Sequence, residues 1–183
     1  MTLRITGTMA AIAAALTLAV EPASANDQDL WAKAVAASAC EPASENQAAE
    51  VSLSNGAWVF VGNNTGTVTF WCPLSLNAYT VSNGSHDNDV SSFRVYYRDS
   101  DGQSGQARVT ARMTYRRADG LYAAGSTFDS NVSTNTGNTT RVHNVAHDVR
   151  SEALYGFLVT LRRSNANQSP AFSGIDFPFP AVP

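Results

Sequence analysis

The chain has almost no lysine. Lys33 is the only one among its 12 basic residues, and only 15% of the 183 residues are charged. The net charge of −3 at pH 7 argues against a nucleic-acid partner, because such proteins carry a basic surplus. Residues 26–89 hold one basic and seven acidic side chains, whereas residues 90–183 hold ten arginines and seven acidic side chains. Arginine is therefore concentrated in the second half of the chain.

Long hydrophobic runs are also missing. The longest apolar stretch, Met9–Val20, follows Arg4 and precedes Ala23-Ser24-Ala25, which is the order of a secretory signal. This stretch is too short to serve as a permanent membrane anchor. We expect residues 1–25 to be removed, and residues 26–183 to form a single secreted or periplasmic domain without a membrane span.

Cysteine is scarce, since Cys40 and Cys72 are the only two in the chain. An even number of cysteines in an exported protein predicts a disulfide between them. Two alternatives are a lipoprotein cleavage site at "AASAC", which ends at Cys40, and a redox-active pair, although the chain has no Cys-x-x-Cys motif.

Three short stretches carry a resemblance: "CEPAS" from Cys40, "VTFWCPL" at 68–74 and "FRVYYRD" at 93–99. Together they resemble a group of small secreted bacterial proteins of uncharacterised function, which have a Cys-x-Pro start and a Val-x-x-x-Cys-Pro-Leu motif. The resemblance implies export and a β-rich fold, and it implies no activity.

β-branched and aromatic runs, separated by Asn-Gly and Asp-Gly, dominate the rest of the chain. The pattern predicts strands at 57–62, 66–72, 77–82, 91–99, 106–117, 121–128, 139–146, 154–163 and 171–177. This spacing favours an all-β fold, an antiparallel β-sandwich that is jelly-roll-like or Ig-like, with a barrel as the alternative. We also expect a short helix at 29–39. The low-complexity segment 126–140 is predicted to be a mobile loop.

The segments 91–99, 106–117 and 121–128 are predicted to form a meander. Alternation places Phe93, Val95 and Tyr97 on the core side, together with alternate residues from Ala107 to Tyr115. A three- or five-residue loop with Gly102 at positive φ keeps these apolar faces in register. At Asp119-Gly120 a two-residue turn is expected, which sets Tyr115 opposite Ala124.

The opposite side of this meander is predicted to be rich in arginine and aromatic side chains. If the strand that contains Trp71 lies in the same sheet, one face combines Arg94, Tyr96, Arg98, Arg108, Arg112 and Trp71. Guanidinium groups bind carboxylates and sulfates, and flat aromatic rings stack on sugars. These six residues are the candidate ligand face, with an ordinary solvated face as the alternative.

Other motifs give weaker indications of chemistry. Ser85-His86-Asp87 spells a triad, but adjacent residues in an extended chain point in opposite directions, so a turn is expected. His143 and His147 have the spacing of helical zinc ligands with Asp148 beside them, yet their segment favours a strand. Asp99-Ser-Asp101-Gly102 resembles half a calcium loop without its further ligands. We therefore predict no catalytic residue, no metal and no cofactor.

The sequence thus favours a secreted, non-enzymatic binding or interaction module, with an acidic glycan or a cell-surface polymer as its ligand. A structural or protein-partner envelope domain is the alternative. A metal-dependent hydrolase built on His143 and His147 is the third hypothesis.

Overall fold

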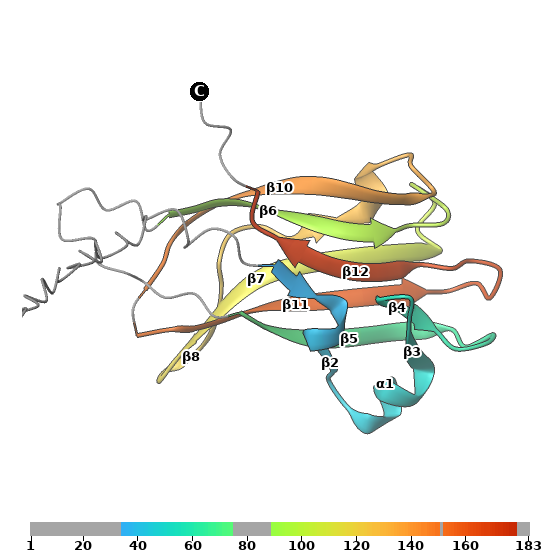
Figure 1. Ribbon diagram of the computed structural model, residues 1–183, viewed down its shortest axis with the longest axis horizontal. Helices are drawn as coiled ribbons and strands as arrows, with labels where there is room; N and C mark the ends of the chain where they lie inside the picture. Colours follow the sequence, from blue (N-terminus) through green and yellow to red (C-terminus); the bar gives the residue numbers. More distant parts are fainter. Residues whose placement is uncertain (1–33, 75–88, 151, 179–183) are drawn as a thin grey trace, which may run out of the picture.

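The computed structural model describes residues 34–74, 89–150 and 152–178, which form two antiparallel sheets packed face to face (Figure 1). The first sheet, called the β6 sheet, has the order β10-β6-β12-β4-β3, with β1 paired to β12. The second, called the β7 sheet, has the order β2-β5-β11-β7-β8, with β9 paired to β7. In Figure 1 the β6 sheet lies in front of the β7 sheet. The predicted all-β sandwich is confirmed.

The elements have the following bounds. The β6 sheet contains β1 (Ala34–Ala36), β3 (Val51–Ser54), β4 (Ala57–Phe60), β6 (Asp89–Arg98), β10 (Asn138–Asp148) and β12 (Ala171–Asp176). The β7 sheet contains β2 (Glu41–Pro42), β5 (Gly66–Leu74), β7 (Ala107–Arg117), β8 (Gly120–Ala123), β9 (Phe128–Asp129) and β11 (Leu154–Arg163). The helical elements are η2 (Ala37–Ala39), α1 (Glu45–Glu50) and η3 (Ser130–Val132). No helix among these is long and apolar enough to cross a bilayer.

Alternating side chains from both sheets fill the space between them. Phe93 of β6 meets Phe157 of β11 with ring centroids 5.0 Å apart, and Trp58 of β4 meets Phe70 of β5 at 5.3 Å. Both contacts join one sheet to the other, as expected for a sandwich whose inner faces interdigitate. The predicted core sides of β6 and β7 are confirmed, since Phe93, Val95 and Tyr97 are buried, as are Ala107, Val109, Ala111 and Met113.

Most of the predicted strands are present. The segments 57–62, 66–72, 91–99, 106–117, 139–146, 154–163 and 171–177 each coincide with a strand to within a few residues, whereas 77–82 lies outside the described residues. The segment 121–128 is not one strand, because β8 ends at Ala123 and β9 begins at Phe128. Strand β3 was not predicted.

The expected helix at 29–39 is wrong over its described part. Residues 34–36 form β1 on the edge of β12, and a short 3-10 turn follows. Here strand pairing overrides the helix propensity of an alanine-rich segment. A helix forms instead at Glu45–Glu50, where the Ser44 side chain accepts a hydrogen bond from Gln47 N at 3.3 Å. The Ser-x-x-Gln spacing is a capping-box signal that the sequence does contain.

The predicted meander is wrong at its first turn. Strands β6 and β7 belong to different sheets, and the segment between Arg98 and Ala107 crosses from one layer to the other. Gly102 has the predicted positive φ, 63°. At the second turn β7 and β8 do pair, but Tyr115 lies opposite Tyr122, a register two residues away from the expected one.

The segment 126–140 is not a free loop. Phe128 and Asp129 pair with β7 as β9, residues 130–132 form η3, and β10 starts at Asn138. Phe128 and Ser130 are buried. The composition of the segment gives no sign that these two side chains are buried, and their burial attaches the segment to the sandwich.

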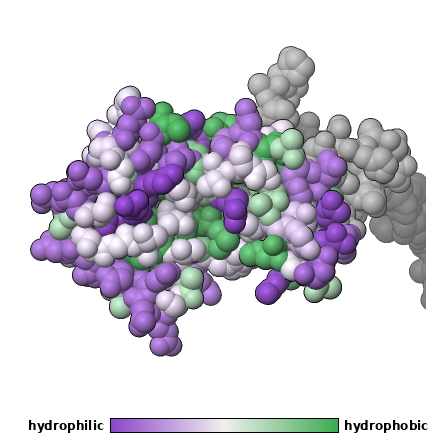
Figure 2. All heavy atoms as spheres, turned by 180° about the vertical axis from the view of Figure 1, so that it is seen from behind, coloured by the Kyte–Doolittle hydropathy of each residue, from purple (hydrophilic) through white to green (hydrophobic). Residues whose placement is uncertain are grey.

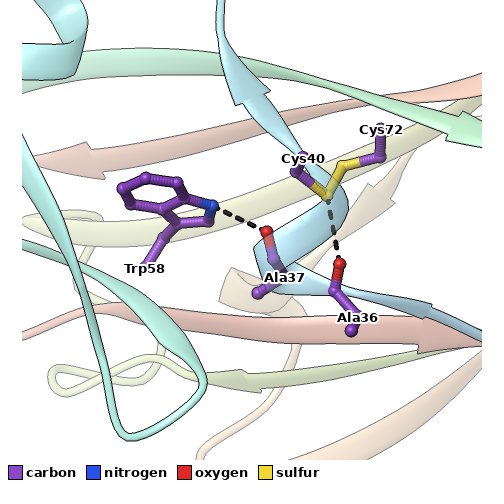
Figure 3. Close-up of a disulfide and its surroundings, with 5 residues drawn as sticks. All are labelled: Ala36, Ala37, Cys40, Trp58 and Cys72. Carbon is purple, nitrogen blue, oxygen red and sulfur yellow. Dashed lines mark hydrogen bonds between the residues drawn. A yellow bond between two sulfur atoms is a disulfide. The ribbon is translucent and has the colours of Figure 1, made fainter.

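A disulfide joins Cys40 to Cys72, as predicted (Figure 3). Both cysteines are almost completely buried, and Cys72 lies on the inner side of β5. Beside them, Trp58 Nε1 donates a hydrogen bond of 2.8 Å to Ala37 O (Figure 3). The bridge and this bond attach the incoming segment to both sheets.

Removing the disulfide is expected to destabilise the protein by about 3–4 kcal/mol, because the bridge restricts the unfolded chain across its sequence separation of 32 residues. The measurement is chemical denaturation of wild type and of the double variant Cys40→Ala/Cys72→Ala. Equal free energies of unfolding in the two proteins would contradict the expectation.

Candidate functional site

The sandwich divides the six candidate ligand residues between two outer faces. Strand β6 presents Arg94, Tyr96 and Arg98 on the outer side of the β6 sheet, which we call the Tyr96 face. Strands β5 and β7 present Trp71, Arg108 and Arg112 on the outer side of the β7 sheet, which we call the Trp71 face. Packed sheets lie about 10 Å apart, and their outer faces point in opposite directions. The expected single face is therefore wrong.

On the Tyr96 face, two of the three residues donate hydrogen bonds to the same carboxylate, that of Asp176. Arg94 Nε donates to Asp176 Oδ1 at 2.9 Å, and the Tyr96 hydroxyl donates to Asp176 Oδ2 at 2.7 Å. The hydrogen bond to Asp176 raises the pKa of both Arg94 and Tyr96. Arg98 differs, because its Nε donates to the carbonyl of Ser169 at 2.6 Å and it forms no ion pair with a described carboxylate.

On the Trp71 face, the indole lies against the backbone of Gly156. A Cβ added at Gly156 would come within 2.4 Å of Trp71 Cζ2 and 2.9 Å of the Cys72 carbonyl oxygen. Only glycine leaves room for the ring in this position. Trp71 itself is half-buried, so part of the indole surface is left to solvent.

The register aligns Trp71 with an arginine two strands away. Trp71 of β5 is opposite Leu158 of β11, and Leu158 is opposite Arg112 of β7. Adjacent strands are about 4.8 Å apart, so this row places the indole and the guanidinium about 10 Å apart at their backbones. Arg112 is exposed and has no ion pair within the described part of the chain.

The Trp71 face carries a surplus of positive charge. Arg108 is neutralised by Asp129, with two hydrogen bonds between guanidinium and carboxylate. Arg112, Arg116 and Arg162 are exposed and form no ion pair with a described carboxylate. The acidic side chain closest to Trp71 in the register is Glu41, directly opposite on β2. The face is thus cationic on a protein whose net charge is −3.

Sequence alternation missed Arg162. It lies directly opposite Arg108 across β11 and β7, where two like charges would repel without Asp129. The outward position of Arg162 follows from the buried residues on either side of it, Leu161 and Arg163.

Figure 2, which views the protein from the side of the β7 sheet, shows a mainly hydrophilic surface with small hydrophobic patches near its middle.

The half calcium loop of the sequence is the segment that crosses between the sheets. The Asp101 carboxylate accepts hydrogen bonds from the Ser104 hydroxyl and from the N–H groups of Gln106 and Ala107. Asp99 is fully buried and accepts a hydrogen bond from the Ser130 hydroxyl. Burial raises the pKa of Asp99 to about 6; the nearby Asp101 carboxyl adds to the rise, and Ser130 opposes it. These contacts shape the crossing.

The histidines contact aromatic and hydroxyl groups. His143 Nε2 is 3.0 Å from the Ser126 hydroxyl, and His147 Nε2 is 2.9 Å from the Tyr155 hydroxyl. Burial lowers the pKa of His147. Within residues 34–74, 89–150 and 152–178, no three His, Cys, Asp or Glu side chains are grouped so that they could hold a metal ion. Ser85-His86-Asp87 lies outside the described residues.

Comparison with solved structures gives distant similarities. The CBM36-1 domain of a multidomain xylanase from the hindgut metagenome of Trinervitermes trinervoides is 11% identical, with TM-score 0.39, over 82% of this chain and 98% of that one. CBM29_1, a family 29 carbohydrate binding module from Piromyces equi, is 9% identical, with TM-score 0.35, over 80% of this chain and 85% of that one. An arabinose-bound MgGH51 α-L-arabinofuranosidase is 13% identical, with TM-score 0.40, over 79% of this chain and 24% of that one.

No family model matches the sequence, and no curated protein does. Structural similarity at this level carries no information about ligand or activity.

Gly156→Ala is expected to displace the Trp71 indole and to destabilise the protein by about 1–3 kcal/mol, the usual cost of an overpacked site. Denaturant unfolding measures the loss, and the tryptophan emission spectrum reports the moved ring. Gly137→Ala is the matched control, since its added Cβ makes only an ordinary contact of 3.5 Å with Asn135. Equal destabilisation by the two substitutions would contradict this view of Gly156.

Asp99 is expected to make stability depend on pH. Because its pKa is raised in the folded state, the folded protein binds more protons than the unfolded chain between pH about 4 and about 6, where stability falls as pH rises. Asp99→Asn cannot ionise and keeps an acceptor for Ser130. Thermal unfolding should show that the stability of this variant no longer falls between pH about 4 and about 6. At pH 7 the variant should be more stable than wild type. The same gain in Asp148→Asn, an exposed control, would contradict the assignment.

Proposed function

We propose that the protein is a non-enzymatic module that binds acidic glycan through the Trp71 face. The observation that carries the proposal is a half-exposed indole on one sheet face of a net negative protein, together with three exposed arginines that form no ion pair with a described carboxylate. The local positive potential attracts an anionic polymer, although the whole protein repels it. Exposed arginines that served only to cover the sheet would gain stability from carboxylate partners, as Arg108 does.

Each group has a chemical part in this binding. Trp71 offers an apolar ring on which the face of a sugar stacks. Arg112 offers a planar fork of donors that matches a carboxylate or a sulfate on a neighbouring sugar. The half-buried Leu158 lies between them and provides an apolar floor.

The proposed setting is extracellular or periplasmic. The disulfide suits an oxidising compartment, in agreement with the secretory signal expected at residues 1–25. Acidic polysaccharides of an envelope or matrix are natural ligands there. The proposal therefore requires neither a cofactor nor a catalytic group.

One observation favours the alternative of a protein-partner domain. Leu154 is 73% exposed and Leu121 is 50% exposed, and both lie opposite Arg116 on the same sheet face. Apolar side chains around an arginine are common in protein interfaces. This edge of the Trp71 face would then contact a protein.

Trp71→Ala and Arg112→Ala are each expected to weaken binding to an acidic polysaccharide about tenfold, the effect of losing one stacking or charged contact worth about 1.4 kcal/mol. The measurement is titration calorimetry with a uronic-acid polymer and a neutral polymer at low and high salt. The affinity for the uronic-acid polymer should fall as the salt concentration rises, because salt screens the charges of the exposed arginines.

Arg150→Ala is the control for charge, since it removes one exposed arginine from the segment between β10 and β11, outside the strands of the Trp71 face; its guanidinium lies 5.8 Å from the Tyr115 ring, so thermal unfolding checks that the variant folds. Affinity that falls equally in Arg150→Ala and Arg112→Ala would mean that only net charge matters. Tighter binding to single-stranded DNA of matched charge, or no binding to the acidic polymer, would overturn the proposal.

A further inference from the structure

The Tyr96 face contains a hollow of about 220 Å³ that the proposed function does not use. Its floor consists of small side chains, Ala57 and Val59 of β4 and Ala171 of β12. Ala171 is opposite Val59 on one side and opposite Arg98 on the other, so the floor and one wall belong to a single row across the sheet. The volume is below the about 300–1,000 Å³ of sites for drug-sized ligands, which fits one small ring.

A tight hairpin turn and a β-bulge form two sides of this hollow. Asn55 and Gly56 turn β3 into β4 with positive φ values of 49° and 78°, the Asn-Gly geometry of a tight hairpin, and Asn55 lines one end. On β12 the pairing register shifts between Phe172 and Gly174, and the bulge leaves Ser173 exposed at the rim.

The polar groups of the hollow define its charge. Asn138 of β10 lies opposite Arg98, and both line the same wall. Arg98 is anchored by its bond from Nε to the Ser169 carbonyl and has no carboxylate partner among the described residues. Among the described residues, no acidic side chain lines the hollow. One uncompensated guanidinium is thus surrounded by amides and hydroxyls.

We propose that this hollow binds a single uronic acid unit, whose carboxylate pairs with Arg98 and whose hydroxyls meet Asn138, Asn55 and Ser173. A carboxylate is the planar partner that a guanidinium fork favours, and amides and hydroxyls bond to the ring hydroxyls of a sugar. The proposal rests on the proposed function for its ligand class and adds a second, separate site. Because the Tyr96 face and the Trp71 face point in opposite directions, one molecule would then hold two glycan segments.

The test is an NMR titration of the ¹⁵N-labelled protein with glucuronate, with glucose and acetate as reference probes. Glucuronate is expected to shift the amide signals of Ala57, Ala171 and Ser173. Glucose has no carboxylate and acetate has no sugar hydroxyls, so each should bind at least about tenfold more weakly. Equal shifts from acetate would overturn the assignment of a sugar site and leave a simple anion site.

Two variants separate the role of charge from that of shape. Arg98→Gln should weaken glucuronate binding about tenfold by removing the charged hydrogen bonds. Ala57→Phe fills the hollow without changing any charge and should abolish the shifts around it. Thermal unfolding of both variants checks that they fold.

The double variant Trp71→Ala/Arg112→Ala makes the two proposals distinguishable. If the hollow is a separate site, this variant should bind glucuronate there as wild type does, even after it has lost the acidic polymer on the other face. Shifts confined to the Trp71 face would overturn the second site and leave the proposed function intact. If glucuronate shifts the signals of the hollow but the double variant binds the polymer as tightly as wild type, the proposed function alone would be overturned.

Discussion

The step of the chain from one sheet to the other, between Arg98 and Ala107, determines what every outer surface contains. Asp101 holds the crossing segment through three hydrogen bonds, and Asp99 anchors it to η3 through Ser130. Strands β6 and β7 both continue the inward alternation of apolar residues across this step. Their polar sides nevertheless point away from each other, because the two strands belong to opposite layers. The buried Asp99 and the half-buried Asp101 thus hold the segment whose crossing sends the arginines of β6 and β7 to opposite faces.

The acidic residues then decide which arginines remain available. Asp176 neutralises Arg94, and Asp129 neutralises Arg108. Burial alone would raise the pKa of Asp129, but the Arg108 guanidinium, the Asn131 N–H and the charge of Arg141 together lower it below its usual value. Exposed pairs of this kind contribute only about 0.2–1 kcal/mol each to stability, so their main effect is to cancel charge locally. The unpaired arginines, by contrast, set the potential that an anionic ligand encounters.

The strands and the inward residues could be predicted from the sequence because a two-residue period is a local property. Phe93, Val95 and Tyr97 show it, and so do the buried residues of β11. The pairing of strands is non-local, and the same apolar pattern suits a hairpin and a crossing equally well. Asp101-Gly102 suggested a hairpin, but its carboxylate instead bonds to residues that lead into another sheet. For this reason the six candidate residues were each predicted to point outward, while their division between two faces was not.

The two faces differ in shape because of their smallest residues. On the Trp71 face, Gly156 lets a large ring lie against the sheet, and the result is a raised aromatic surface. On the Tyr96 face, Ala57 and Ala171 leave space beside a hairpin and a bulge, and the result is a hollow.

The thickness of the sandwich between the two faces prevents one sugar unit from touching both. Each face is limited to its own segment of ligand, so any gain from using the two together arises only with a polymer or with two chains. In that case the second contact benefits from the high local concentration that the first contact creates. Under the two proposals, a ligand made of repeated acidic sugars is the class that could bind both of these unlike arginine-bearing faces.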